Sequence, residues 1–179
     1  LHVLISGGVG TGSQLVAENI HSNSLRKDKI FRDYNIGGKD TGVIESELFG
    51  HVKGAFTGAN KDRPGLFLSC DGGTLFLDEI GDAKADIQAR LLKILQSGTF
   101  SHVGEDRDRK VNVRVVAATN KNFKELIDNK KFRTDLFTRF DTLIELDPLS
   151  SRYSDIPELI EFFLIKHNLE VRFSNECID

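Results

Sequence analysis

Short apolar runs that are typical of buried strands alternate along this chain with segments whose apolar residues have helical spacing. Such alternation predicts a parallel sheet with helices on both faces, a three-layer αβα sandwich of the α/β class. Right-handed crossovers would bring the loops that follow the strands to one carboxyl edge, where open α/β sheets bind ligands. The predicted strands are residues 3–5, 31–36, 74–77, 111–118 and 143–146, and the predicted helices are 15–20, 43–49, 87–95, 122–128, 133–140 and 154–167.

The composition excludes several other classes of protein. The 179 residues suit one domain, and 24 basic against 27 acidic residues give a net charge of −3, which argues against a strongly basic nucleic-acid-binding domain. Cys70 and Cys177 lie far apart and form no zinc-ligand pattern, which favours a reduced cytoplasmic location. No apolar run approaches the length of about 18 residues that spans a membrane.

The first predicted strand leads into a glycine-rich loop. Phosphate-binding loops follow the pattern G-x-x-x-x-G-K-[ST], and Gly7 and Gly12 occupy its two glycine positions. Glycines there allow backbone N–H groups to face an anion at a helix N-terminus. A plain glycine-rich turn is the alternative. The candidate nucleotide-binding residues are Gly7, Gly8, Val9, Gly10, Thr11, Gly12, Ser13 and Gln14.

Ser13 and Gln14 depart from this pattern, because they stand at the lysine and hydroxyl positions. The pattern's lysine places a positive charge on the terminal phosphates, whereas Ser13 offers a neutral hydrogen bond. A charge-assisted hydrogen bond contributes about 1.5–3 kcal/mol and a neutral one roughly 1 kcal/mol. We therefore expect nucleotide binding to be weakened about tenfold or more.

Two carboxylates, Asp78 and Glu79, directly follow the apolar strand predicted at 74–77. The first can hold Mg²⁺, usually through water, and the second can polarise an attacking water as a general base. A solvated acidic strand end is the alternative. The glycine-rich loop earlier in the same alternating pattern favours the catalytic interpretation.

Five segments carry a resemblance to a known family. They read ELFGH at 47–51, KGAFTGA at 53–59, GGTLFLDEI at 72–80, AATN at 117–120 and FRTDLFTR at 132–139. In this order, and over nearly the whole chain, they resemble the central AAA+ domain of bacterial enhancer-binding proteins, the sigma-54-dependent transcription activators. The resemblance implies a P-loop ATPase core that uses ATP and Mg²⁺, assembles into a hexameric or heptameric ring, and remodels the sigma-54 RNA polymerase holoenzyme.

In this family the GAFTGA loop touches the sigma factor. The matching residues are Gly54, Ala55, Phe56, Thr57, Gly58 and Ala59. A physical argument agrees, because an aromatic side chain exposed between small residues is costly unless it meets a partner. A surface loop without a partner is the alternative.

Arg133 and Arg139 match the family's trans-acting arginines, which steady charge on a neighbour's γ-phosphate. Within one helix, their spacing of six residues would place them about 240° apart. Surface ion pairing with Asp135 or Asp141 is the alternative. Asn120 matches the first sensor, and Asn35 matches the asparagine that can hold Glu79 away from water until ATP arrives.

Other departures concern signalling and domain extent. Val52 stands where the family usually has glutamate, and Ser150 and Ser151 replace an arginine and a glutamate, although Arg152 is retained. We expect the nucleotide-binding core to span residues 1–168 and a truncated helical lid to begin at 169–179. Receiver and DNA-binding domains would then lie outside the chain. Any contact with DNA would be made by those domains.

Two functional hypotheses remain open. In the first, the chain is an active ATPase that drives transcription initiation. In the second, it is a degenerate regulatory member that binds a partner but binds or hydrolyses ATP poorly. Ser13 favours the second, whereas Asp78 and Glu79 favour the first.

Overall fold

The computed structural model describes residues 1–168 and divides the chain into two compact units. The first unit is Leu1–Leu146, and the second begins at Asp147. Each is described by itself. The lid expected at 169–179 lies outside the described residues.

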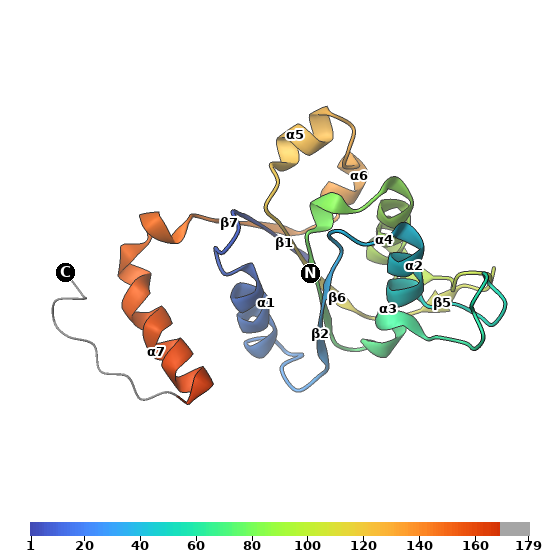
Figure 1. Cartoon of the computed structure of the whole chain (residues 1–179), viewed down its shortest axis with the longest axis horizontal. Helices are drawn as coiled ribbons and strands as arrows, with labels where there is room; N and C mark the ends of the chain where they lie inside the picture. The colour runs from blue at the N-terminus through green and yellow to red at the C-terminus, as the bar shows by residue number, and fades with distance from the viewer. Residues whose placement is uncertain (169–179) are drawn as a thin grey trace. The chain divides into compact units, whose positions relative to one another are not determined.

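The first unit is built on a five-stranded sheet with the order β2-β3-β6-β1-β7, in which every neighbouring pair is parallel. Figure 1 shows the strands running through the centre of this unit, between α1 and the helices of the opposite face. The predicted α/β sandwich is therefore confirmed. The strands are β1 Val3–Gly7, β2 Phe31–Asn35, β3 Thr74–Asp78, β6 Arg114–Thr119 and β7 Thr142–Leu146.

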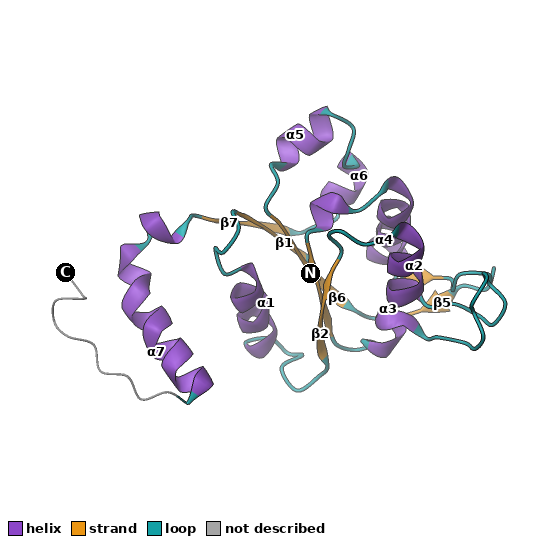
Figure 2. Cartoon of the chain, in the orientation of Figure 1, coloured by secondary structure: helices purple, strands orange, loops and turns teal. Residues whose placement is uncertain are grey.

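Helices cover both faces of this sheet, as the secondary-structure colouring of Figure 2 makes clear. Most of them pack on one face with α2, and α1 packs on the other. The helices of the unit are α1 Ser13–Ser22, α2 Thr41–Phe49, α3 Gly65–Ser69, α4 Ala85–Ser97, α5 Phe123–Asp128 and α6 Thr134–Phe137, with a short 3-10 turn η1 at Ile80–Asp82.

The strands divide their side chains between two apolar cores, because successive residues point to opposite faces. Leu75 and Leu77 of β3 lie in the larger core with α2, α3, α4 and α6. Phe76, between them, lies in the smaller core with Ala17 of α1. Both faces of β3 are therefore buried, which explains its unbroken apolar run.

One strand boundary was predicted wrongly, and two elements were not predicted. Helix α3 occupies Gly65–Ser69, where the sequence analysis placed no element, and its Phe67 is fully buried. The strand predicted from residue 111 begins at Arg114. An antiparallel pair, β4 Thr99–Phe100 with β5 Arg109–Lys110, was not predicted. In each case tertiary contacts rather than local periodicity set the structure.

The second unit contains two 3-10 turns, η2 Leu149–Ser151 and η3 Tyr153–Asp155, followed by α7 Ile156–His167. Pro157 stands in the first turn of α7, where its missing N–H costs nothing. Within residues 1–168, no helix is both long and apolar enough to cross a membrane.

Candidate functional site

A small cavity of about 110 Å³ lies at the carboxyl edge of the sheet. It brings together the three polar segments that the sequence singled out: the glycine-rich loop, the acidic pair and the end of β6. The residues that line it are Gly7, Gly8, Val9, Gly10, Ser13, Asp78, Glu79, Thr119 and Asn120.

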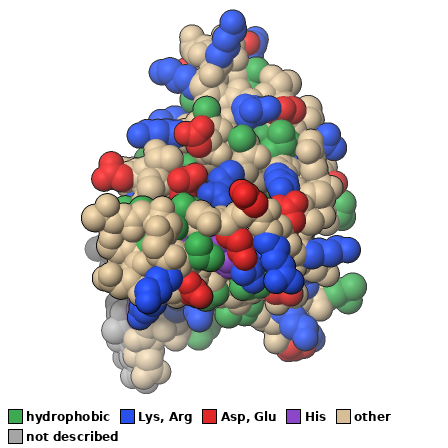
Figure 3. Space-filling model, turned by 90° about the vertical axis from the view of Figure 1, so that its right-hand side faces the viewer, with side chains coloured by type: hydrophobic (Ala, Val, Ile, Leu, Met, Phe, Trp, Pro, Cys, Tyr) green, Lys and Arg blue, Asp and Glu red, His purple; other side chains and the backbone are tan. Residues whose placement is uncertain are grey.

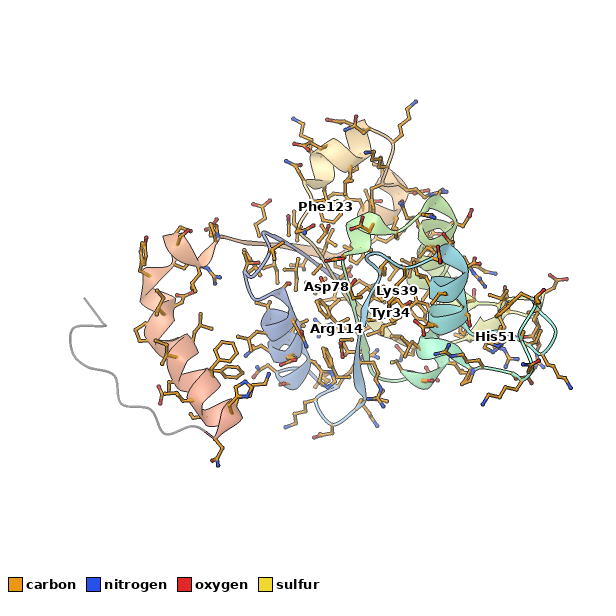
Figure 4. All side chains as sticks on the ribbon, in the orientation of Figure 1. Tyr34, Lys39, His51, Asp78, Arg114 and Phe123 are labelled. Carbon is orange, nitrogen blue, oxygen red and sulfur yellow. The ribbon has the colours of Figure 1, made fainter. Side chains whose placement is uncertain are left out.

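Parallel strand register explains this convergence. Ser6 pairs with Thr119 across β1 and β6, and Leu77 pairs with Ala117 across β3 and β6. The residues that follow each strand therefore emerge side by side, although they are far apart in sequence. Figure 4 labels Asp78 at this edge.

The glycine-rich loop is closed by its own backbone and by one hydroxyl group. Thr11 donates from its backbone N–H to the Gly8 carbonyl at 3.3 Å and from its Oγ1 to the same oxygen at 2.9 Å. Gly10 and Gly12 have φ of 81° and 90°, which side chains other than that of glycine rarely tolerate. The sequence therefore selects this loop shape through glycine.

Helix α1 begins at Ser13, directly after Gly12, and no side chain caps its N-terminus. The first backbone N–H groups of a helix have no partner within the helix, and together with the helix dipole they favour an anion. Gln14 turns away along the helix, where its Nε2 donates to Glu18 Oε1 at 3.2 Å. The backbone of the loop thus suits a phosphate group.

The charge of this cavity differs from the pattern of phosphate-binding loops. Ser13 contributes a hydroxyl group where that pattern has lysine, and none of the described residues lining the cavity is a lysine or arginine. Its charged members are Asp78 and Glu79, both acidic. Within this cavity, the groups that can attract a phosphate are the backbone N–H groups, whereas Lys121 and Lys124 line the larger cavity that adjoins it.

The acidic pair has an unusual backbone. Glu79 has φ 54° and ψ 40°, a left-handed conformation that is strained for a residue with a side chain. Asp78 accepts a hydrogen bond from the Glu79 backbone N–H at its Oδ1, at 2.9 Å, which stabilises this sharp turn out of β3. The strained backbone and the hydrogen bond together place both acidic residues at the wall of one cavity.

The two asparagines occupy different positions. Asn120 lines the cavity beside Thr119, a residue that the sequence analysis did not single out although it ends the same strand. Asn35 is the register partner of Asp78, and its Oδ1 accepts the Gly37 N–H at 2.6 Å. Asn35 was expected to hold Glu79, but its side-chain oxygen accepts from Gly37, and no hydrogen bond joins Asn35 to Glu79 among the described residues.

The residues present fit phosphate groups and a hydrated cation. Carboxylate oxygens are the ligands that Mg²⁺ prefers, and Asp78 supplies them beside the loop. A water occupies roughly 30 Å³ in the liquid, so a cavity of about 110 Å³ can take a group of the size of a phosphate. The sugar and base of a nucleotide would lie outside it. No cluster of three or more His, Cys, Asp or Glu side chains that could bind a metal directly occurs within residues 1–168.

A larger cavity of about 580 Å³ adjoins the first and shares Gly7, Gly8 and Asn120 with it. One wall of this cavity is apolar. The sequence analysis did not predict this wall. The side chains of that wall are Phe123, Ile127, Phe137 and Leu143.

The two arginines do not lie on one helix, which corrects the expected 240° separation. Helix α6 spans only Thr134–Phe137, with Arg133 as its extended N-cap residue and Arg139 beyond its end. After Phe137 the chain continues in turns, with the Arg139 N–H bonded to the Leu136 carbonyl at 3.1 Å and the Phe140 N–H to the Phe137 carbonyl at 3.2 Å. Neither arginine lines the cavity of its own chain.

Arg133 forms a bidentate pair with Asp135, from Nε to Oδ1 at 2.9 Å and from Nη2 to Oδ2 at 2.8 Å. Hydrogen bonding from Arg133 lowers the pKa of the Asp135 carboxyl group. Both side chains are exposed, so the pair is an open surface contact that either partner can leave. With the Gln96 amide turned so that its oxygen faces Arg139, this oxygen accepts hydrogen bonds from the guanidinium Nη2 at 3.1 Å and Nε at 3.3 Å.

The loop Gly54–Ala59 lies in a different part of the unit. Gly54 N–H donates to the Ala59 carbonyl at 2.9 Å, and Ala59 N–H donates to the Phe56 carbonyl at 3.0 Å, so the loop is closed on itself. Phe56 is 45% exposed at its tip. Its ring meets the ring of His51 edge-on, with centroids 4.9 Å apart. In Figure 4, His51 is labelled well away from Asp78.

Charges of both signs surround this loop. Figure 3 shows the face of the molecule that lies on the right-hand side of Figure 1, with Lys and Arg interspersed among Asp and Glu. Asp62 Oδ1 accepts the Lys53 backbone N–H at 2.7 Å, and Arg63 pairs with Glu47 at 3.4 Å. The exposed ring of Phe56 is therefore an apolar feature beside a mixed polar surface.

The fold and the cavity define a class before any relative is considered. A parallel sheet with a glycine loop after β1, acidic residues after β3 and an asparagine after β6 is the arrangement of a P-loop NTPase core of the AAA+ type. The model of the sigma-54 interaction domain matches residues 1–145. The chain belongs to this family.

Individual relatives agree. The chain is 49% identical over 165 residues to the Nif-specific regulatory protein of Azotobacter vinelandii, covering 92% of this chain and 32% of that protein. It is also 49% identical over 165 residues to the DNA-binding transcriptional regulator NtrC of Escherichia coli K12, covering 92% and 35% respectively. The chain thus spans about a third of the length of these relatives.

Among solved structures, NtrX from Brucella abortus in complex with ADP superimposes with a TM-score of 0.81. Its sequence identity is 32%, and the match covers 92% of this chain and 36% of that one.

Proposed function

We propose that this chain is the nucleotide-dependent core of an activator of the sigma-54 RNA polymerase holoenzyme. It binds ATP with Mg²⁺ at the loop from Gly7 to Gln14 and acts on the polymerase through the loop Gly54–Ala59. The observation that carries this proposal is the convergence of the glycine-rich loop, the acidic pair and Asn120 on one cavity. The ADP complex of NtrX supports it, because that protein shares the fold around the cavity.

Each cavity residue has a role in this proposal. The backbone of Gly7–Gly12 and the first turn of α1 hold the phosphates, and Asp78 holds Mg²⁺ through water. When bound, Mg²⁺ supplies positive charge against the phosphate oxygens. Glu79 accepts a proton from the attacking water as general base, and Asn120 orients that water.

The loop Gly54–Ala59 is the surface through which the chain contacts the sigma factor. Phe56 supports this role, because a large aromatic side chain that is 45% exposed has apolar area available for a partner. The remaining residues of the loop are small and let the ring protrude. The cost of exposing this ring to water is relieved when it is buried in an interface.

A ring of six or seven copies, which the family resemblance implies, is supported by the position of the arginines. Since Arg133 and Arg139 lie outside the cavity of their own chain, a guanidinium that steadies phosphate charge must come from a neighbouring copy. DNA contact belongs to segments outside this chain. The net charge of −3 agrees with that division.

The test is open-complex formation at a sigma-54 promoter by the full-length protein and sigma-54 holoenzyme. We expect open complexes with ATP and none with buffer alone. Open complexes that form equally well without nucleotide, or none under either condition, would contradict the proposal. Asp78→Asn provides a matched variant that keeps side-chain size and removes the charge, and it is expected to lose activity.

A second candidate function is favoured by one observation, the absence of lysine and arginine among the described residues that line the cavity. In this alternative, the chain is a degenerate regulatory member of the family that binds a protein partner through Phe56 but binds or hydrolyses ATP poorly. Steady-state ATPase measurements distinguish the two candidates, because only the first predicts turnover that rises with ATP concentration to a plateau.

A further inference from the structure

The carboxylate of Glu79 lies directly against the bare Cα of Gly37. A Cβ at position 37 would overlap Glu79 Oε2 and would lie 2.8 Å from Glu79 Cδ and 3.1 Å from Asn35 Oδ1. The observed orientation of Glu79 and a side chain at position 37 therefore exclude one another.

Both sides of this contact are fixed by the backbone. Asn35 and Asp78 are register partners, and the Ile36 N–H donates to the Asp78 carbonyl at 3.0 Å. Asn35 Oδ1 then anchors the Gly37 N–H at 2.6 Å. The loop that carries Gly37 and the turn that carries Glu79 are thus joined at the ends of adjacent strands.

By contrast, the Glu79 carboxylate itself is weakly held. Among residues 1–168, the Glu79 carboxylate forms no hydrogen bond or ion pair. Its neighbours differ, because Asp78 accepts a backbone hydrogen bond and Asp82 pairs with Lys121. Its contact with Gly37 is one of packing. Rotation about its side-chain bonds would carry the carboxylate from Gly37 toward the cavity, whose wall Glu79 also forms.

We propose that Gly37 is a positioning residue for Glu79. Its missing side chain provides a seat that holds the carboxylate against the loop after β2, and leaving this seat frees the carboxylate to accept a proton from water in the cavity. This inference rests on the proposed ATP hydrolysis. It assigns part of the control of hydrolysis to a residue that touches neither phosphate nor polymerase.

Gly37→Ala tests the seat with little damage to the fold. The φ of Gly37 lies outside the left-handed range, so alanine is tolerated by the backbone, and the overlapping atom is the free end of a flexible side chain. The matched control is Gly42→Ala, since a Cβ at Gly42 meets nothing within 4 Å and its φ is also outside that range.

In the full-length protein, we expect Gly37→Ala to raise kcat for ATP hydrolysis about fivefold, by shifting Glu79 toward its free orientation. The dissociation constant for Mg-ATP should stay unchanged, and Gly42→Ala should leave both quantities unchanged. In a Glu79→Asp background, whose shorter side chain does not reach Gly37, the gain should disappear. An unchanged or lower kcat in Gly37→Ala would overturn the proposal.

A second measurement is independent of hydrolysis. Crystal structures of the nucleotide-free wild-type and Gly37→Ala proteins should show the carboxylate on Gly37 in the first and displaced into the cavity in the second. Wild-type density that places the carboxylate elsewhere would refute the seat. If neither protein hydrolyses ATP, the proposed function fails. The two crystal structures then still show whether Gly37 holds the Glu79 carboxylate.

Discussion

The cavity at the sheet edge and the loop Gly54–Ala59 depend on different parts of the chain. The cavity is built largely from backbone, with glycines at φ of 81° and 90° and strand ends in register. The loop presents a single large side chain, Phe56, on a backbone closed by its own hydrogen bonds. Substitution of one side chain is therefore expected to weaken the first site and to abolish the second.

This difference explains how Ser13 can coexist with an intact cavity. Replacing a lysine removes one charge, whereas the loop shape depends on Gly10, Gly12 and the Thr11 hydrogen bonds to Gly8. The geometry of a phosphate site thus survives without its strongest electrostatic contact. What changes is affinity, which can be measured.

The largest effect is expected from Phe56→Ala. Truncating an aromatic side chain at the centre of an interface typically costs 2 kcal/mol or more, about a thirtyfold loss. We expect a loss of at least that size in open-complex formation, with the Mg-ATP dissociation constant unchanged. Leu25→Ala, a fully exposed apolar residue elsewhere in the unit, is the control. A parallel loss of nucleotide affinity in Phe56→Ala would show that the two regions are not independent.

Gly12→Ala is expected to have the next largest effect, at the other region. A left-handed backbone costs roughly 1–2 kcal/mol with a side chain present, and a Cβ at Gly12 meets nothing within 4 Å, so the effect is one of backbone strain alone. Mg-ATP affinity, measured by calorimetry, should fall about tenfold. Gly8→Ala, whose φ is outside the left-handed range, should bind almost as the wild type does. Equal losses in both variants would argue against a cradle built by backbone shape.

The smallest effect is expected from His51→Ala, which removes the ring that packs edge-on against Phe56. An aromatic pair of this kind contributes about 0.5–1.5 kcal/mol, so open-complex formation should fall roughly threefold. His51→Phe keeps the ring contact, loses the hydrogen bond with Ser46 Oγ, and should retain most of the activity. If His51→Phe is as impaired as His51→Ala, the hydrogen bond rather than the ring orders the loop.

The central strands β1, β3 and β6 could be read from the sequence because they are largely buried on both faces, whereas β2 and β7 at the edges of the sheet are mostly exposed and were read from their short apolar runs. Runs such as 74–77 and 143–146 fall within a residue of β3 and β7. Val111 and Val113 were misleading, since both are buried in the larger core but precede β6. They are apolar because they cover that core, and periodicity cannot distinguish this from strand pairing.

The cavity was predictable once the parallel sheet was predicted, because parallel strands bring the residues at their carboxyl ends, here Gly7, Asp78 and Asn120, to one edge. The early end of the helix expected at 133–140 was not predictable, because the chain passes after Phe137 into turns that periodicity does not distinguish from a continuing helix. The seat at Gly37 was equally hidden. Its signal, two glycines directly after a strand, predicts a turn and says nothing about which side chain packs against it.

The central claim is that the loop Gly7–Gln14 binds phosphate through its backbone and is weakened by the missing lysine charge. Calorimetric titration of Mg-ATP into the full-length wild-type protein and its Ser13→Lys variant tests this claim directly. We predict saturable binding in both, about tenfold tighter in Ser13→Lys. No saturable heat in the wild type, or equal affinity in the two proteins, would contradict it.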